Sequence, residues 1–103
     1  MTRSERLCHV SEVPADSVLG IDRGRLRIGL AYVDGKLRAF DTRCPHTGAD
    51  LSEGILDGDG VDCPHHLWHF ELTGGACTMV PGYGIDVFPV RIDDSWVVVE
   101  LPD

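Results

Sequence analysis

The chain has 103 residues, of which 43% are hydrophobic, and its formal net charge is −8. This length predicts a single compact domain over residues 1–103, whose small core would gain stability from a bound metal centre. The charge argues against nucleic acid and anionic membranes as partners, because both require clustered Lys and Arg. Neither a signal-peptide pattern nor about 18 consecutive apolar residues occur, so the sequence predicts a cytoplasmic protein without a membrane span.

Period-two alternation predicts β-strands, and helical periodicity is absent. Apolar residues alternate with others along residues 25–32, as a half-buried strand requires. Asp34-Gly35 then separates this run from a second short run, and an Asp-Gly pair between two alternating segments predicts a type I′ hairpin. The chain therefore begins as an antiparallel β-structure.

A second hairpin is predicted near the C-terminus, where residues 85–92 and 96–101 flank the turn Asp93-Asp94-Ser95. Pro89 cannot donate a hydrogen bond to a neighbouring strand, so the strand that contains it is expected at a sheet edge. Residues 42–82, between the two hairpins, are rich in Gly, Pro, Asp and His. Such a segment buries little apolar surface, so it is either disordered or tied by a bound group, with short strands and tight turns.

Acidic residues crowd this segment and its borders: Asp41, Asp50, Glu53, Asp57, Asp59, Asp62 and Glu71. Arg43 is the one basic residue among them in the sequence. A run of like charge is usually a solvated face. It equally has the character of a docking surface for a basic partner, and the sequence favours neither interpretation.

Two short motifs in the segment combine a thiol with an imidazole, Cys44-x-His46 and Cys63-x-x-His66. Proline follows each cysteine, and because it fixes φ and removes a backbone donor, it would hold each loop open toward a metal. Three centres compete for this set. Zinc fingers usually keep both cysteines in one motif and both histidines in the other. A blue-copper site needs one Cys and two His, whereas a Rieske [2Fe-2S] centre uses two of each.

The motifs and their surroundings resemble the Rieske family over almost the whole chain. "AFDTRCPHTGADLSEG" is similar to the family's first cluster loop, "VDCPHHLWHFELTGG" to its second, and "FPVRIDDSWVVVEL" to its closing hairpin. The resemblance implies an all-β fold of antiparallel sheets, a small barrel or sandwich base with the cluster-binding subdomain inserted at about 42–82. It implies one [2Fe-2S] cluster, held by Cys44 and Cys63 on one iron and His46 and His66 on the other.

Other residues of the two loops follow from the same resemblance. His65 occupies a variable position and is expected to face solvent, and Leu67 stands where the family usually has glycine. If that position requires a positive φ, leucine costs about 1 to 2 kcal/mol there. Trp68 and Phe70 are expected to pack beneath the loops, and His9 and His69 to be ordinary strand residues.

Further positions carry less specific expectations. Pro81-Gly82 is interpreted either as the family's third, shielding loop or as an ordinary turn. Cys8 and Cys77 have no partner at ligand spacing and are expected to be packed free thiols. In high-potential members, a disulfide and two hydroxyl groups surround the cluster. The matching positions here are Ala49, His65, Trp68 and Phe70. We therefore expect a reduction potential toward the low end of roughly −150 to +300 mV.

A non-catalytic role is expected, because neither a 2-His-1-carboxylate iron site nor a Gly-rich dinucleotide motif occurs. The resemblance implies a Rieske-type ferredoxin that carries one electron from a flavin-dependent reductase to a terminal, aromatic-ring-hydroxylating oxygenase, docking transiently with each. One alternative is the small subunit of a nitrite-reductase-like enzyme. A more distant alternative is a zinc-stabilised structural module.

Overall fold

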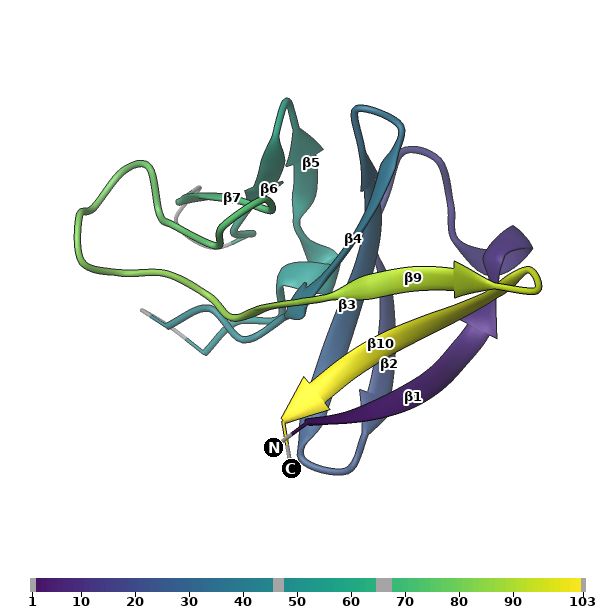
Figure 1. The fold of residues 1–103 in the computed structure, drawn as a ribbon. Coiled ribbons are helices and arrows are strands. Elements are labelled where there is room, and N and C mark those ends of the chain that lie inside the picture. The colour runs from purple at the N-terminus through teal and green to yellow at the C-terminus, as the bar shows by residue number, and fades with distance from the viewer. Residues whose placement is uncertain (1, 46–47, 65–67, 103) are drawn as a thin grey trace.

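The computed structural model describes residues 2–45, 48–64 and 68–102. Its strands form three antiparallel sheets, so the expected all-β class is confirmed (Figure 1). Two short 3-10 turns, η1 (Val10–Glu12) and η2 (Leu51–Glu53), are the helical elements of the described residues. Within the same residues, no helix is long and apolar enough to cross a membrane.

The first sheet joins the two ends of the chain. It has the order β1-β10-β9, with β1 (Thr2–His9), β10 (Trp96–Pro102) and β9 (Val90–Asp93). A bulge interrupts the β1–β10 register, because Arg6 pairs with Val98 and Cys8 with Val97. The extra residue, Leu7, lets two successive side chains of β1 be buried, where strict alternation would expose one.

The second and third sheets carry the centre of the chain. The second has the order β2-β3-β4-β8, with β2 (Leu19–Arg23), β3 (Leu26–Val33), β4 (Lys36–Asp41) and β8 (Val87–Phe88). The third has the order β5-β6-β7, with β5 (Ile55–Asp57), β6 (Gly60–Asp62) and β7 (His69–Glu71). In the sequence, the whole third sheet lies between β4 and β8.

β3 and β4 contribute to two separate apolar cores. Ile28, Leu30 and Ala39 pack with the first sheet, whereas Ala31 and Phe40 pack with residues of the third sheet and its loops. The strand expected over residues 25–32 is present as β3, but its centre, residues 28–31, is buried on both faces where a half-buried strand was expected. Gly29 permits this packing, because a Cβ there would lie 2.5 Å from the Phe40 ring.

The two predicted hairpins are present, with one change at Pro89. Asp34 and Gly35 both have positive φ, 52° and 76°, as a type I′ turn requires. The second turn consists of Asp94 and Ser95, because Asp93 still belongs to β9. The single strand expected over residues 85–92 is two strands. Proline ends β8 at the edge of the second sheet, and β9 begins after it at the edge of the first.

Candidate metal centre

The two Cys-Pro motifs begin loops that are closed in the same way. The N–H of Cys44 donates to the carbonyl of Ala49 over 2.9 Å, and that of Cys63 donates to Trp68 over 2.8 Å. In each loop, the backbone N–H of the cysteine thus donates a hydrogen bond to the carbonyl of the fifth residue after it. The pair that flanks the first loop is Arg43 with Asp50, and the pair that flanks the second is Asp62 with His69. The two loops are hairpin connections of equal span.

Both cysteines at the base of these loops are buried. Cys44 is 1% exposed and Cys63 0%, and both belong to the core that contains Leu51, Val61 and Phe70. No disulfide joins any of the four cysteines. A buried thiol pair supplied by two matched loops has the donor chemistry that the inner iron of a Rieske centre requires. The described part of the loops therefore fits such a group.

Several residues named from the sequence lie outside the described residues. These are the expected ligands His46 and His66, together with His65 and Leu67. Their roles stay predictions.

A polar network fastens the first loop to the second sheet. Both the N–H and the hydroxyl of Thr42 donate to the carbonyl of Arg27 over 3.0 Å. Arg27 Nε in turn donates to Asp50 Oδ2 over 2.7 Å. Burial raises the pKa of Asp50, but hydrogen bonds from Ser52 and Arg27 outweigh burial and the pKa is lowered overall. Asp50 is therefore a structural carboxylate beside the loop.

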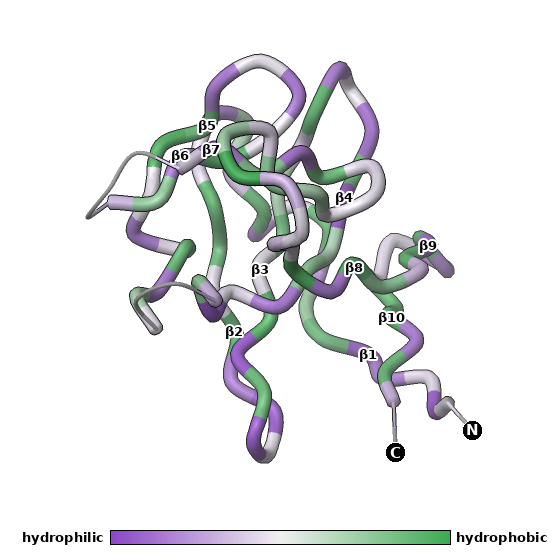
Figure 2. The backbone as a smooth tube through the Cα atoms, turned by 90° about the vertical axis from the view of Figure 1, so that its left-hand side faces the viewer, coloured by the Kyte–Doolittle hydropathy of each residue, from purple (hydrophilic) through white to green (hydrophobic). Residues whose placement is uncertain are grey.

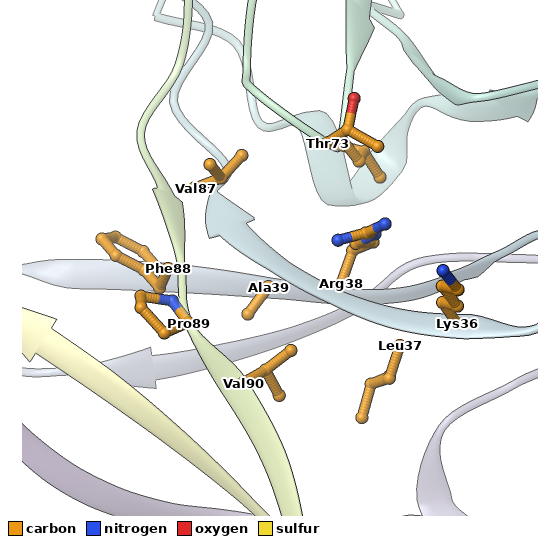
Figure 3. Close-up of a pocket in the computed structure, with 10 residues that line it drawn as sticks. Lys36, Leu37, Arg38, Ala39, Thr73, Val87, Phe88, Pro89 and Val90 are labelled. Carbon is orange, nitrogen blue, oxygen red and sulfur yellow. The ribbon is translucent and has the colours of Figure 1, made fainter.

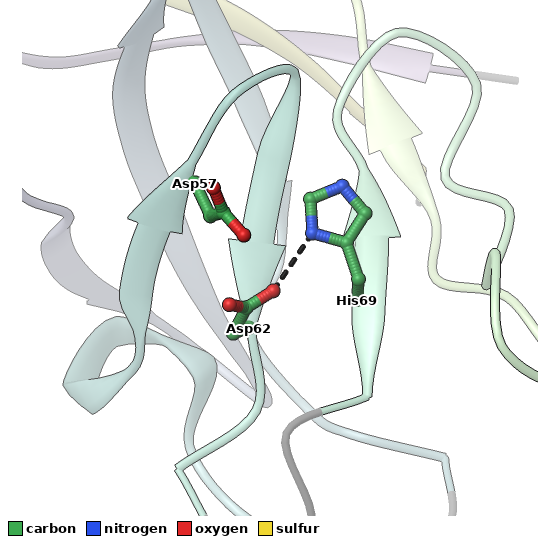
Figure 4. Close-up of side chains that lie close together, drawn as sticks. All are labelled: Asp57, Asp62 and His69. Carbon is green, nitrogen blue, oxygen red and sulfur yellow. Dashed lines mark hydrogen bonds and ion pairs between the residues drawn. The ribbon is translucent and has the colours of Figure 1, made fainter.

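His69, just after the second loop, bridges two carboxylates. Its Nδ1 lies 2.7 Å from Asp62 Oδ1, and its Nε2 lies 2.7 Å from Asp59 Oδ1. Figure 4 shows that Asp57 lies on the same face of the third sheet as Asp62 and His69. Potential ligand atoms of these three residues lie within 4.8 Å of one another. Burial lowers the pKa of His69, but the two carboxylates outweigh burial and raise the pKa above 6.5. His69 is thus a link between acids, where we expected an ordinary strand histidine.

The segment after β7 folds back against the second loop. Thr78 N–H donates to the carbonyl of His69 over 2.9 Å, and the rings of Trp68 and Tyr83 meet edge to face with centroids 5.3 Å apart. Gly82 has a φ of 93°, which favours glycine. Of the two interpretations of Pro81-Gly82, these contacts favour a third loop. This third loop, which contains Pro81-Gly82 and Tyr83, packs against Trp68 at the end of the second cysteine loop. The expected burial beneath the loops is confirmed for Phe70, and Trp68 is partly buried.

The remaining cysteines are packed thiols, as expected. Cys77 is 7% exposed and lies in the same core as Cys44 and Cys63, while its N–H donates to the carbonyl of Tyr83. Cys8 is 6% exposed in the other core, and burial raises the pKa of its thiol. Neither residue begins a loop of the kind that Cys44 and Cys63 begin.

The sequence missed the groups that surround the loops. Arg27 precedes the first motif by 17 positions, and Tyr83 follows the second motif by 17, so neither falls within a local pattern. A hollow of about 170 Å³ lies beside the first loop and is lined by residues of the β2–β3 turn, β3, β4 and that loop. A larger one, about 470 Å³, lies between β4 and the β8–β9 connection, and none of its lining residues is an expected ligand (Figure 3).

An all-β base that presents two matched cysteine loops is an architecture suited to a metal centre held between two loops. Residues 4–89 match the family model of the Rieske [2Fe-2S] domain. The chain is 35% identical over 98 residues to a 3-phenylpropionate/cinnamic acid dioxygenase ferredoxin subunit from Shigella boydii, covering 93% of this chain and 92% of that one. The chain therefore belongs to the Rieske [2Fe-2S] domain family.

Solved structures agree with this assignment. A ferredoxin from Sphingomonas yanoikuyae superposes with a TM-score of 0.88 at 30% identity, covering 97% of this chain and 100% of that one. A chain from a complex of reduced oxygenase and oxidized ferredoxin in carbazole 1,9a-dioxygenase superposes with a TM-score of 0.84 at 28% identity. This match covers 93% of this chain and 91% of that one. A nitrite reductase small subunit from Mycobacterium tuberculosis superposes with a TM-score of 0.89 and covers 100% of this chain and 98% of that one. Its sequence identity is 21%, so the match shows a shared fold alone.

Proposed function

We propose that this protein is a soluble Rieske-type ferredoxin, an electron-transfer component without catalytic activity of its own. It would carry one electron from a flavin-dependent reductase to a terminal oxygenase that hydroxylates aromatic rings. The buried pair Cys44 and Cys63, each at the base of a hairpin loop of the same span, carries the proposal. The dioxygenase ferredoxin subunit at 35% identity supports the class of system. The cytoplasmic location and the single domain stay predictions.

Four residues would hold one [2Fe-2S] cluster. Cys44 and Cys63 would bind the inner iron from within the core, and His46 and His66 would bind the outer iron, as the family motif implies. When bound, a Rieske cluster accepts and releases one electron. Leu51, Val61 and Phe70 exclude water from the cysteine side, which favours exchange of the electron at the outer, histidine side.

Iron and sulfide analysis of mutants tests this ligand set. We expect Cys44→Ala and Cys63→Ala to lose iron, sulfide and visible absorption, because each removes a thiolate ligand. Cys77→Ala is the matched control, since Cys77 is also buried in the same core and begins no loop of this kind. Full colour in either loop mutant would contradict the assignment. Electron paramagnetic resonance of the reduced protein, with coupling to imidazole nitrogen, tests the two histidines.

The electron-carrier role itself is tested by redox titration and by one-electron exchange. We expect a reduction potential toward the low end of roughly −150 to +300 mV at neutral pH. A value well above zero would contradict this expectation, which rests on the lack of a disulfide and of hydroxyl groups at the matching positions. A colourless, zinc-containing protein would instead support the structural module. Stable co-purification with a large subunit would support the nitrite-reductase-like alternative.

A further inference from the structure

Two arginine side chains beside the first loop have no partner within the described chain. Arg25 and Arg43 are exposed, and neither side chain makes a hydrogen bond or ion pair with another described residue. The chain has 17 acidic and nine basic residues, so carboxylates are plentiful. These two guanidinium groups are nonetheless left free to bind a carboxylate from outside.

Both arginines line the same hollow of about 170 Å³, together with Gly48 and Ala49 of the first loop and the acidic residues Asp41 and Asp50. Arg27 also lines it, but its guanidinium is held by Asp22 over 3.1 Å and by Asp50 over 2.7 Å. Arg27 therefore shapes the wall, whereas Arg25 and Arg43 offer unused donors. Arginine is suited to this role, since its planar group binds a carboxylate through two parallel hydrogen bonds.

The hairpin that precedes the second loop is acidic. Asp57, Asp59 and Asp62 lie on the hairpin of β5 and β6 or in its turn, and this hairpin points away from the turn between β2 and β3 that carries Arg25 (Figure 1). Figure 2 shows that the β2–β3 turn is hydrophilic. The first cysteine loop thus lies beside a hollow with two arginines that have no ion-pair partner among the described residues, whereas the hairpin of β5 and β6 is acidic.

We propose that Arg25 and Arg43 form a docking site for a carboxylate side chain on the surface of an electron-transfer partner. This inference rests on the proposed function and adds the chemistry of the contact. The net charge of −8 repels an acidic partner surface as a whole. A local pair of arginines would therefore set the orientation of docking, because it attracts the carboxylate to the hollow beside the first loop. The partner surface would then carry both a carboxylate and, opposite the acidic hairpin, basic groups.

A small redox reagent coated with carboxylates tests the site without knowledge of the partner. The cobalt(III)–EDTA complex is a monoanion, and it takes one electron from the dithionite-reduced protein to give cobalt(II)–EDTA. Net charge alone predicts that its rate rises with ionic strength, because two anions repel less when screened. Docking at the arginines predicts the opposite sign, a rate that falls as salt is added.

Three variants separate the local effect from the change in net charge. We expect Arg25→Glu and Arg43→Glu each to slow oxidation by cobalt(III)–EDTA about fivefold or more at low ionic strength, and to reverse the sign of the salt dependence. Lys36→Glu is the matched control. It makes the same charge change at the other end of the β3–β4 hairpin, in the separate hollow of Figure 3, and should keep the wild-type behaviour.

A cationic oxidant, tris(phenanthroline)cobalt(III), checks that each variant still donates electrons, and its rate should not fall. A second readout does not depend on electron transfer. In the oxidised protein, the Nε–H resonance of Arg25 should shift and saturate on titration with cobalt(III)–EDTA, and Arg43→Glu should weaken the binding.

The docking inference is overturned if Arg25→Glu and Lys36→Glu behave alike, or if the wild-type rate rises with salt. A site for small anions in general is the alternative. It is supported, and the docking inference overturned, if acetate at equal concentration shifts the Arg25 Nε–H resonance as strongly as cobalt(III)–EDTA does and Arg25→Glu leaves the oxidation rates unchanged. A protein that neither oxidant can oxidise contradicts the proposed function itself, and the Arg25 titration still decides the docking site.

Discussion

Arg27 on β3 donates from Nε to Oδ2 of Asp50 over 2.7 Å, which ties the second sheet to the residue that closes the first cysteine loop. The other oxygen of Asp50 accepts from the N–H of Ser52 over 2.9 Å and from its hydroxyl over 2.7 Å, so it caps η2. One carboxylate therefore fixes both the end of the loop and the start of the turn that leads to β5.

Asp50→Ala should destabilise the protein by about 0.5–2 kcal/mol, because it removes the cap of η2. Asp50→Asn keeps an acceptor for Ser52 and loses mainly the ion pair with Arg27. Since the Arg27 side chain is 40% exposed, that loss should be less than about 1 kcal/mol. Urea unfolding with equal slopes for both variants measures the difference. Equal destabilisation by Asn and Ala would show that the ion pair dominates.

The raised pKa of His69 predicts that its contribution to stability depends on pH. A raised folded-state pKa means that the folded protein binds the proton more tightly, so the contribution is complete below the unfolded value of about 6.5 and is lost as pH rises through the folded pKa. The unfolding free energy of the wild type should therefore exceed that of His69→Gln by more at about pH 6 than at about pH 9. An NMR titration that places the His69 pKa at or below 6.5 would contradict this.

Gly60→Ala should destabilise the third sheet. A Cβ at Gly60 would lie 1.9 Å from the backbone carbonyl oxygen of Phe70, so β7 must move away from β6. Overpacking of this kind costs about 1–3 kcal/mol, and the same shift would disturb the loop that Cys63 begins. Gly74→Ala is the control, because its nearest neighbour is a flexible Glu71 oxygen at 3.4 Å. Thermal unfolding and iron release should change for the first variant and hardly for the second.

Tyr83 should act through its ring. Tyr83→Phe keeps the edge-to-face contact with Trp68 and should be close to neutral. Tyr83→Ala removes the contact, which is worth about 0.5–1.5 kcal/mol. The third loop would then no longer be held against Trp68 at the end of the second cysteine loop. We expect faster release of iron to a chelator from the alanine variant only. Equal release rates for wild type and Tyr83→Ala would show that the third loop does not protect the centre.

Local signals in the sequence were sufficient for the turns and the motifs. Asp34-Gly35 predicted a type I′ hairpin because few residue pairs tolerate two positive φ values in succession, and the structure has that turn. Pro89 predicted a sheet edge because it has no N–H, and it lies between two edge strands. Non-local pairing gave no such signal. β1 is polar along much of its length and forms its sheet by pairing with β10, at the other end of the chain.

The amino-acid sequence by itself determined the chemistry: two Cys-Pro loops, each with a thiol and an imidazole, on a β-rich chain with excess acid. Residue type and short spacing carry that information, because ligand identity is a local property. The tertiary structure decided what surrounds the loops. It brought Arg25 and Arg27 beside the first loop, placed Tyr83 against Trp68 and buried both faces of the centre of β3, because strand pairing and burial join residues that no local pattern connects.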